Sequence, residues 1–226
     1  MGKKRLLIGC YHKSVILTYV GVGAALCGIF YLLQGGEERH IRAGLLCLIT
    51  GGLCDLFDGP VARRCQRTQT EEAYGVQIDS LADVTVSLLL PVLLLFRMGQ
   101  NINAIIIVAT AILYTLAGIT RLAWFSVLTA KQDEGRITCY QGLPVTYMAL
   151  ILPLYRVIGQ AMAKGAAMAG ADGGMLLRGG DIMVVVLYLV VAFLFVLHVD
   201  IKKPVGIWYL IFPILAVIVS VLVCIL

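Results

Sequence analysis

Residues 55–83 read DLFDGPVARRCQRTQTEEAYGVQIDSLAD, and this stretch decides how the chain can fold. It opens with Asp55 and Asp58, three residues apart, and closes with Asp79 and Asp83, four residues apart. On a helix, residues at these spacings lie on one face, one turn from each other. The stretch therefore predicts two helices joined by a short basic loop, an arrangement that could bring all four carboxylates together.

The chain around this stretch is strongly apolar. Of its 226 residues, 60% are hydrophobic and only 14% are charged, and the mean hydropathy is +0.94. In an ordinary soluble domain about a quarter of the residues are charged, and several apolar runs here reach the ~20 residues that cross a bilayer. The composition therefore excludes an ordinary soluble domain and predicts an all-α, multi-pass integral membrane protein.

Hydropathy and polar breaks predict the membrane-spanning helices and their connections. The predicted spans cover residues 14–33, 42–63, 75–96, 102–127, 143–163, 181–199 and 206–226. Polar connections are expected at 64–74 and 130–142, and residues 164–180 are expected to form a loop or a frayed helix. Residues 1–13 are basic and too short to span, so they predict an N-terminal interfacial segment, followed by a single membrane domain over 14–226.

Lysine and arginine are distributed unevenly between the two sides of this layout. One side carries Lys3, Lys4, Arg5, Lys13, Arg63, Arg64, Arg67, Lys131, Arg136, Lys202 and Lys203. The other side carries Arg39, Arg42, Arg97, Lys164 and Arg178. Because cytoplasmic loops are enriched in these residues, we expect the N-terminus and the four-aspartate end to face the cytoplasm, with the protein in the cell membrane.

Four aspartates inside apolar spans need compensation, because hydrocarbon tolerates an ionised carboxylate poorly. Hard divalent cations prefer oxygen ligands, so a metal site is one interpretation. A secondary transporter, in which intramembrane carboxylates bind Na⁺ or H⁺, is another. The chain has no inverted repeat, and the aspartates lie at the ends of two adjacent spans, which favours the metal site. The seven cysteines have no ordered spacing and predict neither disulfides nor a zinc site.

Written as spacing, the stretch is D-x2-D-G-x2-A-R, then eleven residues, then G-x3-D-x3-D. This pattern resembles the signature of the CDP-alcohol phosphotransferases, integral membrane enzymes that make phospholipids. The matching positions are Asp55, Asp58, Gly59, Ala62, Arg63, Gly75, Asp79 and Asp83. The resemblance implies a six-helix catalytic core, here followed by one additional C-terminal span. The gap from Arg63 to Gly75 is longer than the commonest family spacing, so Thr68 or Thr70 is a candidate nucleotide contact.

The resemblance also implies roles for individual residues. Asp55, Asp58 and Asp79 would ligate one or two Mg²⁺ or Mn²⁺ ions. Asp83 would belong to the same metal-binding acidic set and act as the general base. The contacts to the CDP-lipid would come from Gly59, Ala62, Arg63 and Gly75. Arg121, within a span, either binds the acceptor substrate or balances the charge of the aspartates.

Three further stretches, GVQIDSLADV, RLAWFSV and YQGLPVT, resemble the phosphatidylserine synthase branch of this family. The reaction implied is transfer of a phosphatidyl group from CDP-diacylglycerol to L-serine, which releases CMP. Glycerol 3-phosphate or inositol phosphate is the alternative acceptor, but a phosphate-bearing acceptor would call for a basic cluster beyond Arg63 and Arg121. We expect membrane lipid around the chain, a homodimer, as the resemblance implies, and no nucleic-acid partner.

Overall fold

The computed structural model describes residues 9–10, 13–65, 67–130, 139–168, 173–202 and 208–225. The helices are α1 (Lys13–Gln34), α2 (Glu38–Arg63), α3 (Gln69–Asp83), α4 (Leu90–Met98), α5 (Ala104–Ala130), α6 (Met148–Met168), α7 (Gly173–Val196) and α8 (Trp208–Ile225). A π-helical segment, η1 (Val84–Leu89), joins α3 to α4 as one rod, and a 3₁₀ turn, η2 (Val145–Tyr147), precedes α6. The prediction of an all-α protein is confirmed.

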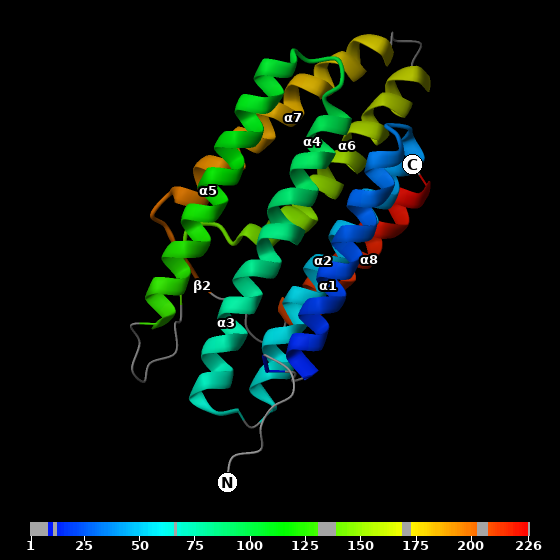
Figure 1. Cartoon of the computed structure of the whole chain (residues 1–226). Coiled ribbons are helices and arrows are strands. Elements are labelled where there is room, and N and C mark those ends of the chain that lie inside the picture. The colour runs from blue at the N-terminus through cyan, green and yellow to red at the C-terminus, as the bar shows by residue number, and fades with distance from the viewer. Residues whose placement is uncertain are drawn as a thin grey trace.

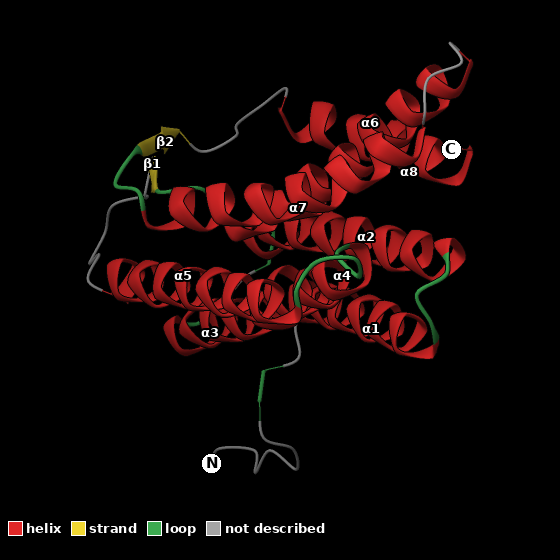
Figure 2. Cartoon of the chain, turned by 90° about the horizontal axis from the view of Figure 1, so that it is seen from above, coloured by secondary structure: helices red, strands yellow, loops and turns green. Residues whose placement is uncertain are grey.

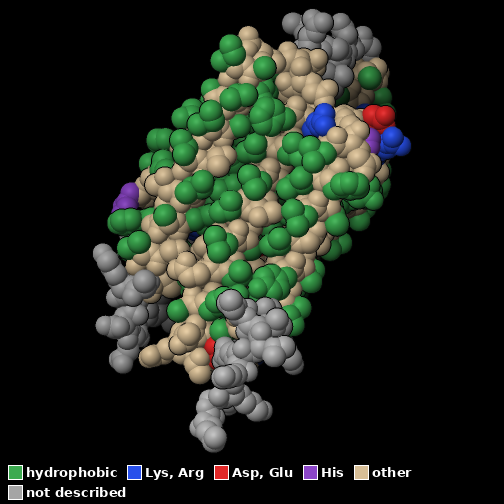
Figure 3. Space-filling model, viewed as in Figure 1, with side chains coloured by type: hydrophobic (Ala, Val, Ile, Leu, Met, Phe, Trp, Pro, Cys, Tyr) green, Lys and Arg blue, Asp and Glu red, His purple; other side chains and the backbone are tan. Residues whose placement is uncertain are grey.

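The helices have the length and hydropathy of membrane spans. Within the described residues, the helices long and apolar enough to cross a membrane are Val15–Gln34, Glu38–Ala62, Gln69–Met98, Ala104–Thr129 and Val145–Met168. Shorter apolar helices are Asp181–Val196 and Tyr209–Ile225. Figure 3 shows one face of the molecule covered by hydrophobic side chains, with few charged groups away from its ends. The chain is therefore a multi-pass membrane protein.

Several element boundaries differ from the sequence prediction, among them the start of α7 at Gly173 instead of residue 181. Helix α2 starts at Glu38, four residues before the predicted start of its span. Helix α3 starts at Gln69, so the predicted loop over 64–74 was wrong in its second half. Thr68 caps α3: its hydroxyl accepts the Glu71 amide at 3.3 Å, and the Glu71 carboxylate accepts the Thr68 amide at 2.9 Å. Such a capping box stabilises a helix start that consists of polar residues, which is why hydropathy alone placed the start too late.

The rods pack in two layers around α2. Figures 1 and 2 show α1, α3, α4 and α5 on one side and α6, α7 and α8 on the other, with α2 between them and in contact with α1, α6 and α8. Glycines on α2 allow this close approach. A Cβ added at Gly51 would lie 2.6 Å from a Val86 methyl, and one added at Gly52 would lie 2.4 Å from the Ala149 Cβ. Small residues at helix interfaces have this effect in membranes.

A short ribbon joins the connections that precede α6 and follow α7. Strand β1 (Cys139–Gln141) pairs antiparallel with β2 (Asp200–Lys202). Gly142 follows β1 with φ at +76°, and its amide donates to the Val199 carbonyl at 2.9 Å. A Cβ at this position would lie 2.5 Å from the Phe195 carbonyl oxygen. The ribbon and Gly142 thus fix where η2 and α6 begin, beside the C-terminal half of α2.

Polar contacts join the opposite ends of the same helices. The Glu38 carboxylate, at the start of α2, accepts hydrogen bonds from Arg156 and from Gln160 of α6, the latter at 2.6 Å. Arg42 donates to the carbonyl of Cys224 in α8 at 3.2 Å, and Arg97 of α4 donates to the Leu33 carbonyl at 3.4 Å. The structure therefore groups these helix ends on one side, as the predicted order of spans requires.

The packing of Gly52 generates a stability prediction. In Gly52→Ala, the new methyl group has to push α2 and α6 apart, because its nearest neighbour is another Cβ. Overpacking of this kind costs about 1–3 kcal/mol, which exceeds the gain of about 1 kcal/mol from replacing a helical glycine by alanine. We expect a lower thermal unfolding temperature in detergent. Gly23→Ala is the matched control, since nothing lies within 4 Å of its added Cβ, and it should unfold no earlier than the parent protein.

Candidate active site

The four aspartates of the sequence pattern line one cavity. Asp55 and Asp58 lie on α2, and Asp79 and Asp83 lie on α3, the neighbouring rod. The cavity has an empty volume of about 220 Å³ and is lined by Thr18, Gly21, Gly51, Cys54, Asp55, Asp58, Asp79, Ala82, Asp83 and Val86. The helical spacing therefore had the expected consequence: both pairs of carboxylates face the same space.

Three of the carboxylates form a compact cluster. One oxygen atom from each of Asp55, Asp58 and Asp79 can be chosen so that all three lie within 4.8 Å of one another. The Asp58 residue is buried, with 6% of its surface exposed, whereas Asp55 and Asp79 are half-buried. Asp83 lines the same cavity one helical turn beyond Asp79 and is not part of this cluster of three.

Helix α1 contributes a polar group that the sequence analysis missed. The Thr18 hydroxyl donates a hydrogen bond to Oδ2 of Asp58 at 3.1 Å, and Thr18 is itself buried. A buried hydroxyl needs a partner, so a threonine inside the apolar run SVILTYVGVG was the available signal. This bond ties the Asp58 side chain of α2 to α1.

Arg121 of α5 lies beside the cavity. Its side chain is buried, with 8% of the residue exposed, and its guanidinium lies 5.5 Å from the centre of the Phe125 ring. The guanidinium is close enough for its positive charge to act on the carboxylates of Asp55 and Asp83. The structure therefore brings Arg121 to the acidic site, as either predicted role for this residue requires.

The glycine and alanine positions of the pattern follow the aspartates on α2 and precede them on α3. Gly59 and Ala62 are on the last turns of α2, and Gly75 is on α3. A Cβ added at Gly75 would lie 3.5 Å from Nη1 of Arg67, whose guanidinium pairs with Glu72 at 3.8 Å. The side chain of Arg63 lies outside the described part of the structure.

Thr68 and Thr70 are the residues predicted as candidate nucleotide contacts. The Thr68 side chain already bonds Glu71 as the cap of α3, and its hydroxyl lies 3.0 Å from Oε2 of that residue. Thr70 is exposed in the first turn of the same helix. Arg67 has most of its side chain covered and lies against Gly75, so it is a loop residue beside a position predicted to contact the nucleotide.

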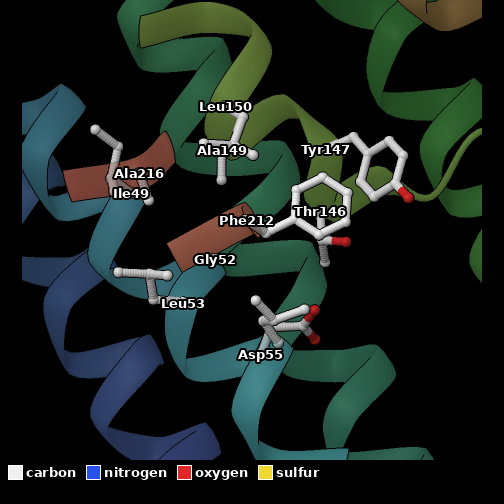
Figure 4. Close-up of a pocket in the computed structure, with 11 residues that line it drawn as sticks. Ile49, Gly52, Leu53, Asp55, Thr146, Tyr147, Ala149, Leu150, Phe212 and Ala216 are labelled. Atoms are coloured by element: carbon white, nitrogen blue, oxygen red, sulfur yellow. The ribbon is translucent and has the colours of Figure 1, made fainter. Parts of the chain in front are cut away.

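A second, larger pocket adjoins Asp55. It has an empty volume of about 410 Å³, and Figure 4 shows the Asp55 carboxylate at one end of it, with Thr146 and Phe212 beside it. Tyr147 and Phe212 pack with their ring centres 5.7 Å apart. Phe212 and Ala216 belong to α8, so the last helix forms part of the wall of this pocket rather than a separate appendage.

The donor set at the cavity fits a hard divalent cation. Carboxylate oxygens are the ligands that Mg²⁺ and Mn²⁺ prefer, and three of them lie close enough to share one ion. The Thr18 hydroxyl holds one ligand candidate in place, which is how outer groups commonly orient a metal ligand. The remaining carboxylate, Asp83, is left to act as a base or to complete the ligand set.

Comparison with known proteins points to one family. A model of the CDP-alcohol phosphatidyltransferase family matches residues 12–226. A curated relative from Methanocaldococcus jannaschii is 34% identical over 121 residues, which are 50% of this chain and 54% of the relative. A relative from Helicobacter pylori is 33% identical over 140 residues, 62% of this chain and 54% of the relative. Both relatives are named CDP-diacylglycerol–serine O-phosphatidyltransferase.

The family match and the relatives differ in how much they cover. The chain spans about half the length of the curated relatives that it matches. No solved structure matches the chain. The family model, by contrast, covers the helices from α1 to α8, including both halves of the aspartate pattern. The chain therefore belongs to the CDP-alcohol phosphatidyltransferase family.

Proposed function

We propose that this protein transfers the phosphatidyl group of CDP-diacylglycerol to L-serine, giving phosphatidylserine and CMP. One observation carries the proposal: four aspartates from two adjacent helices line one cavity, with three carboxylate oxygens within 4.8 Å of one another. Clustered carboxylates are costly inside a membrane protein unless positive charge compensates them, and a bound cation supplies such charge. A CDP-activated lipid carries two phosphates, so a metal held here would have a substrate to act on.

The metal site is assigned to Asp55, Asp58 and Asp79, with Asp83 in the same acidic set. Members of this family use a divalent metal, and the carboxylate cluster has the geometry to bind one. We assign one or two Mg²⁺ or Mn²⁺ ions to it. When bound, the ions neutralise the pyrophosphate of the donor lipid and polarise the bond that breaks. The protein's own contribution is to hold the ligands rigidly, as the bond from Thr18 to Asp58 illustrates.

The donor substrate would lie across the ends of α2 and α3. Gly59, Ala62 and Gly75 have small side chains or none, so a nucleotide can come close to the backbone there. Arg63 would place a positive charge against the pyrophosphate. The diacylglycerol part is apolar and would stay in the bilayer between helices, while the polar acceptor would arrive from the aqueous side.

Asp83 is proposed as the general base. It would take the proton from the serine hydroxyl while the serine oxygen attacks the phosphorus atom that bears the lipid. A new P–O bond forms to serine, the P–O bond inside the pyrophosphate breaks, and CMP leaves. Transfers of this kind depend on positioning and charge neutralisation more than on covalent help. The position of Asp83 in the cavity, apart from the compact cluster of three, supports a separate role.

Two features support serine as the acceptor. The curated relatives, 33–34% identical, are named as serine phosphatidyltransferases. In addition, an acceptor with a phosphate of its own would need a basic cluster, and among the described side chains that line the acidic cavity none is basic. Arg121, beside that cavity, could bind the single carboxylate of serine.

We place the protein in the cell membrane with the acidic cavity toward the cytoplasm. The support is the excess of lysine and arginine on the side of the chain that carries the 64–68 connection. A homodimer is proposed on the family resemblance alone. Neither proposal affects the chemistry assigned to the cavity.

The metal assignment predicts the behaviour of Asp58→Ala. Loss of one of three clustered carboxylates should weaken Mn²⁺ binding at least about tenfold, because affinity depends on the number of charged ligands. Electron paramagnetic resonance of free Mn²⁺, titrated with the purified protein, measures this affinity. Asp181→Ala is the matched control, since that carboxylate bonds Asn101 at 2.7 Å away from the cavity. Unchanged Mn²⁺ affinity in Asp58→Ala would contradict the assignment.

The base assignment predicts the behaviour of Asp83→Asn. Asparagine keeps the size of the side chain but cannot accept the serine proton, so turnover should fall by about 10²–10⁴-fold. Binding of CDP-diacylglycerol should change by no more than about twofold, because the interaction lost is made only in the transition state. The two are measured as CMP release and as substrate-induced thermal stabilisation. Turnover at the parent rate would remove Asp83 from this role.

The acceptor is tested by CMP release from the purified protein with CDP-diacylglycerol and Mg²⁺ or Mn²⁺. Separate reactions receive serine, glycerol 3-phosphate or inositol phosphate. We expect CMP only with serine, together with phosphatidylserine identified by mass spectrometry. Release with another acceptor would keep the aspartate roles and discard serine. No release with any acceptor, from protein that unfolds cooperatively on heating, would reopen the cation-coupled transporter as an alternative.

A further inference from the structure

The helix that carries Asp79 and Asp83 changes its geometry immediately after Asp83. From Val84 to Leu89 the chain is π-helical, and the Leu90 amide bonds the Thr85 carbonyl, five residues back instead of four. A π-turn contains about one more residue than an α-turn. Each α-helical residue turns the chain by about 100°. The extra residue of the π segment therefore rotates the face that carries Asp83 by about 100° around the helix axis, relative to α4.

This shift has a use in the fold. Residues 83 and 90 are seven apart, so in an uninterrupted α-helix they would share one face. Leu90 and Leu94 are fully buried in the core of the bundle, whereas Asp83 lines the acidic cavity beside α2. The π segment therefore lets one rod present leucines to the core and carboxylates to the cavity.

Pro91 explains why the Ser87 carbonyl needs a partner from another helix. Proline has no amide hydrogen, so residue 91 cannot bond the carbonyl of Ser87, four residues back. Inside a membrane a carbonyl released in this way has to be bonded by a neighbouring helix. The Tyr114 hydroxyl of α5 donates to the Ser87 carbonyl at 2.7 Å. The Tyr188 hydroxyl of α7 donates to the Pro91 carbonyl at 2.5 Å.

The two tyrosines are held rigidly. Both are fully buried, and their ring centres lie 4.9 Å apart at an interplanar angle of 60°. Phe195 packs against Tyr114 with the ring centres 5.4 Å apart. A buried hydroxyl is costly without a partner. Each phenol therefore stays on its carbonyl, that of Ser87 or that of Pro91, and each bond fixes both groups.

Tyr114 is the tyrosine nearer to the cavity. Its bond ends at Ser87, four residues beyond Asp83, whereas the Tyr188 bond ends one turn farther along the rod. The Tyr114 phenol also lies close enough to the Asp83 carboxylate for the two groups to interact electrostatically. On the adjacent turn of α5, a Cβ added at Gly118 would lie 2.3 Å from a Leu88 methyl, so α5 packs tightly on the π segment.

We propose that Tyr114 is a positioning residue for Asp83: by bonding the Ser87 carbonyl, it fixes the π segment and with it the direction in which Asp83 meets the acceptor. The role of Asp83 as the base rests on the proposed function. Tyr114 does not touch the reacting atoms; it acts through the backbone of α3 and η1. A misplacement of the base by about 1 Å can lower the rate on the order of 10²-fold. Loss of the contact from α5 that fixes the direction of Asp83 should therefore lower the rate strongly.

The experiment compares Tyr114→Phe with Tyr188→Phe in the full chain. Each variant removes one hydroxyl, keeps the ring and removes one hydrogen bond from a neighbouring helix to a carbonyl of the same rod. The two should therefore lower the thermal unfolding temperature by similar amounts. We expect kcat for CMP release to fall about ten- to hundredfold in Tyr114→Phe, with KM for CDP-diacylglycerol changed by no more than about twofold. In Tyr188→Phe, kcat should stay within about threefold of the parent value.

A second readout does not depend on the reaction. Amide hydrogen exchange of the peptide that spans residues 79–90, measured without substrate, should rise at least about fivefold in Tyr114→Phe, because local opening becomes easier. An exchange rate in that peptide equal to that of the parent protein would overturn the proposal, even if the protein catalysed a different reaction. Equal losses of kcat in the two variants, in proportion to their losses of stability, would also overturn it.

The failure of this inference is distinguishable from the failure of the proposed function. Parent turnover in Tyr114→Phe together with lost turnover in Asp83→Asn would leave Asp83 as the base and remove Tyr114 as its positioning residue. Faster exchange in Tyr114→Phe together with parent turnover in Asp83→Asn would keep the coupling of α5 to the π segment. That result would discard the base that the coupling is meant to position.

Discussion

The constraint behind this structure is the cost of placing four carboxylates inside a largely apolar bundle. The helices meet it by placing all four on one cavity, where a single divalent cation can interact with several of them. Arg121 adds a fixed positive charge close to Asp55 and Asp83. Two features can therefore compensate the negative charge of the carboxylates: a cluster that fits a cation and the buried guanidinium of Arg121. It is also why the acidic groups come from adjacent helices rather than from one.

Close packing around the cavity follows from the same constraint. Gly51 faces the cavity, and a Cβ there would meet Val86 of the π segment at 2.6 Å. Gly21 of α1 lies where a Cβ would be 3.1 Å from the Cβ of Cys54. These glycines let α1, α2 and η1 come together without filling the space between the carboxylates. Small residues therefore serve the site as well as helix association.

The sequence was sufficient to predict the parts of the fold that depend on local pattern. Helical spacing predicted that Asp55 and Asp58 share one face and that Asp79 and Asp83 share another, and hydropathy located the spans. It failed at the start of α3, where the Thr68–Glu71 capping box makes polar residues helical. The contacts of Thr18, Tyr114 and Phe212 could not be predicted either. Each joins residues at least 27 positions apart, and such contacts depend on how whole helices pack.

The last helix shows how far the site extends beyond its signature. Helix α8 begins some 125 residues after Asp83 in the sequence, yet Phe212 and Ala216 form part of the wall of the pocket that ends at Asp55. The ribbon of β1 and β2 and the φ of Gly142 fix the position of η2, whose Thr146 also lines this pocket. A pocket bounded in this way is apolar at one end and acidic at the other. That polarity matches the proposed substrate, whose hydrocarbon part would stay in the bilayer while its phosphates meet the carboxylates, so the C-terminal helix would form part of the proposed substrate site.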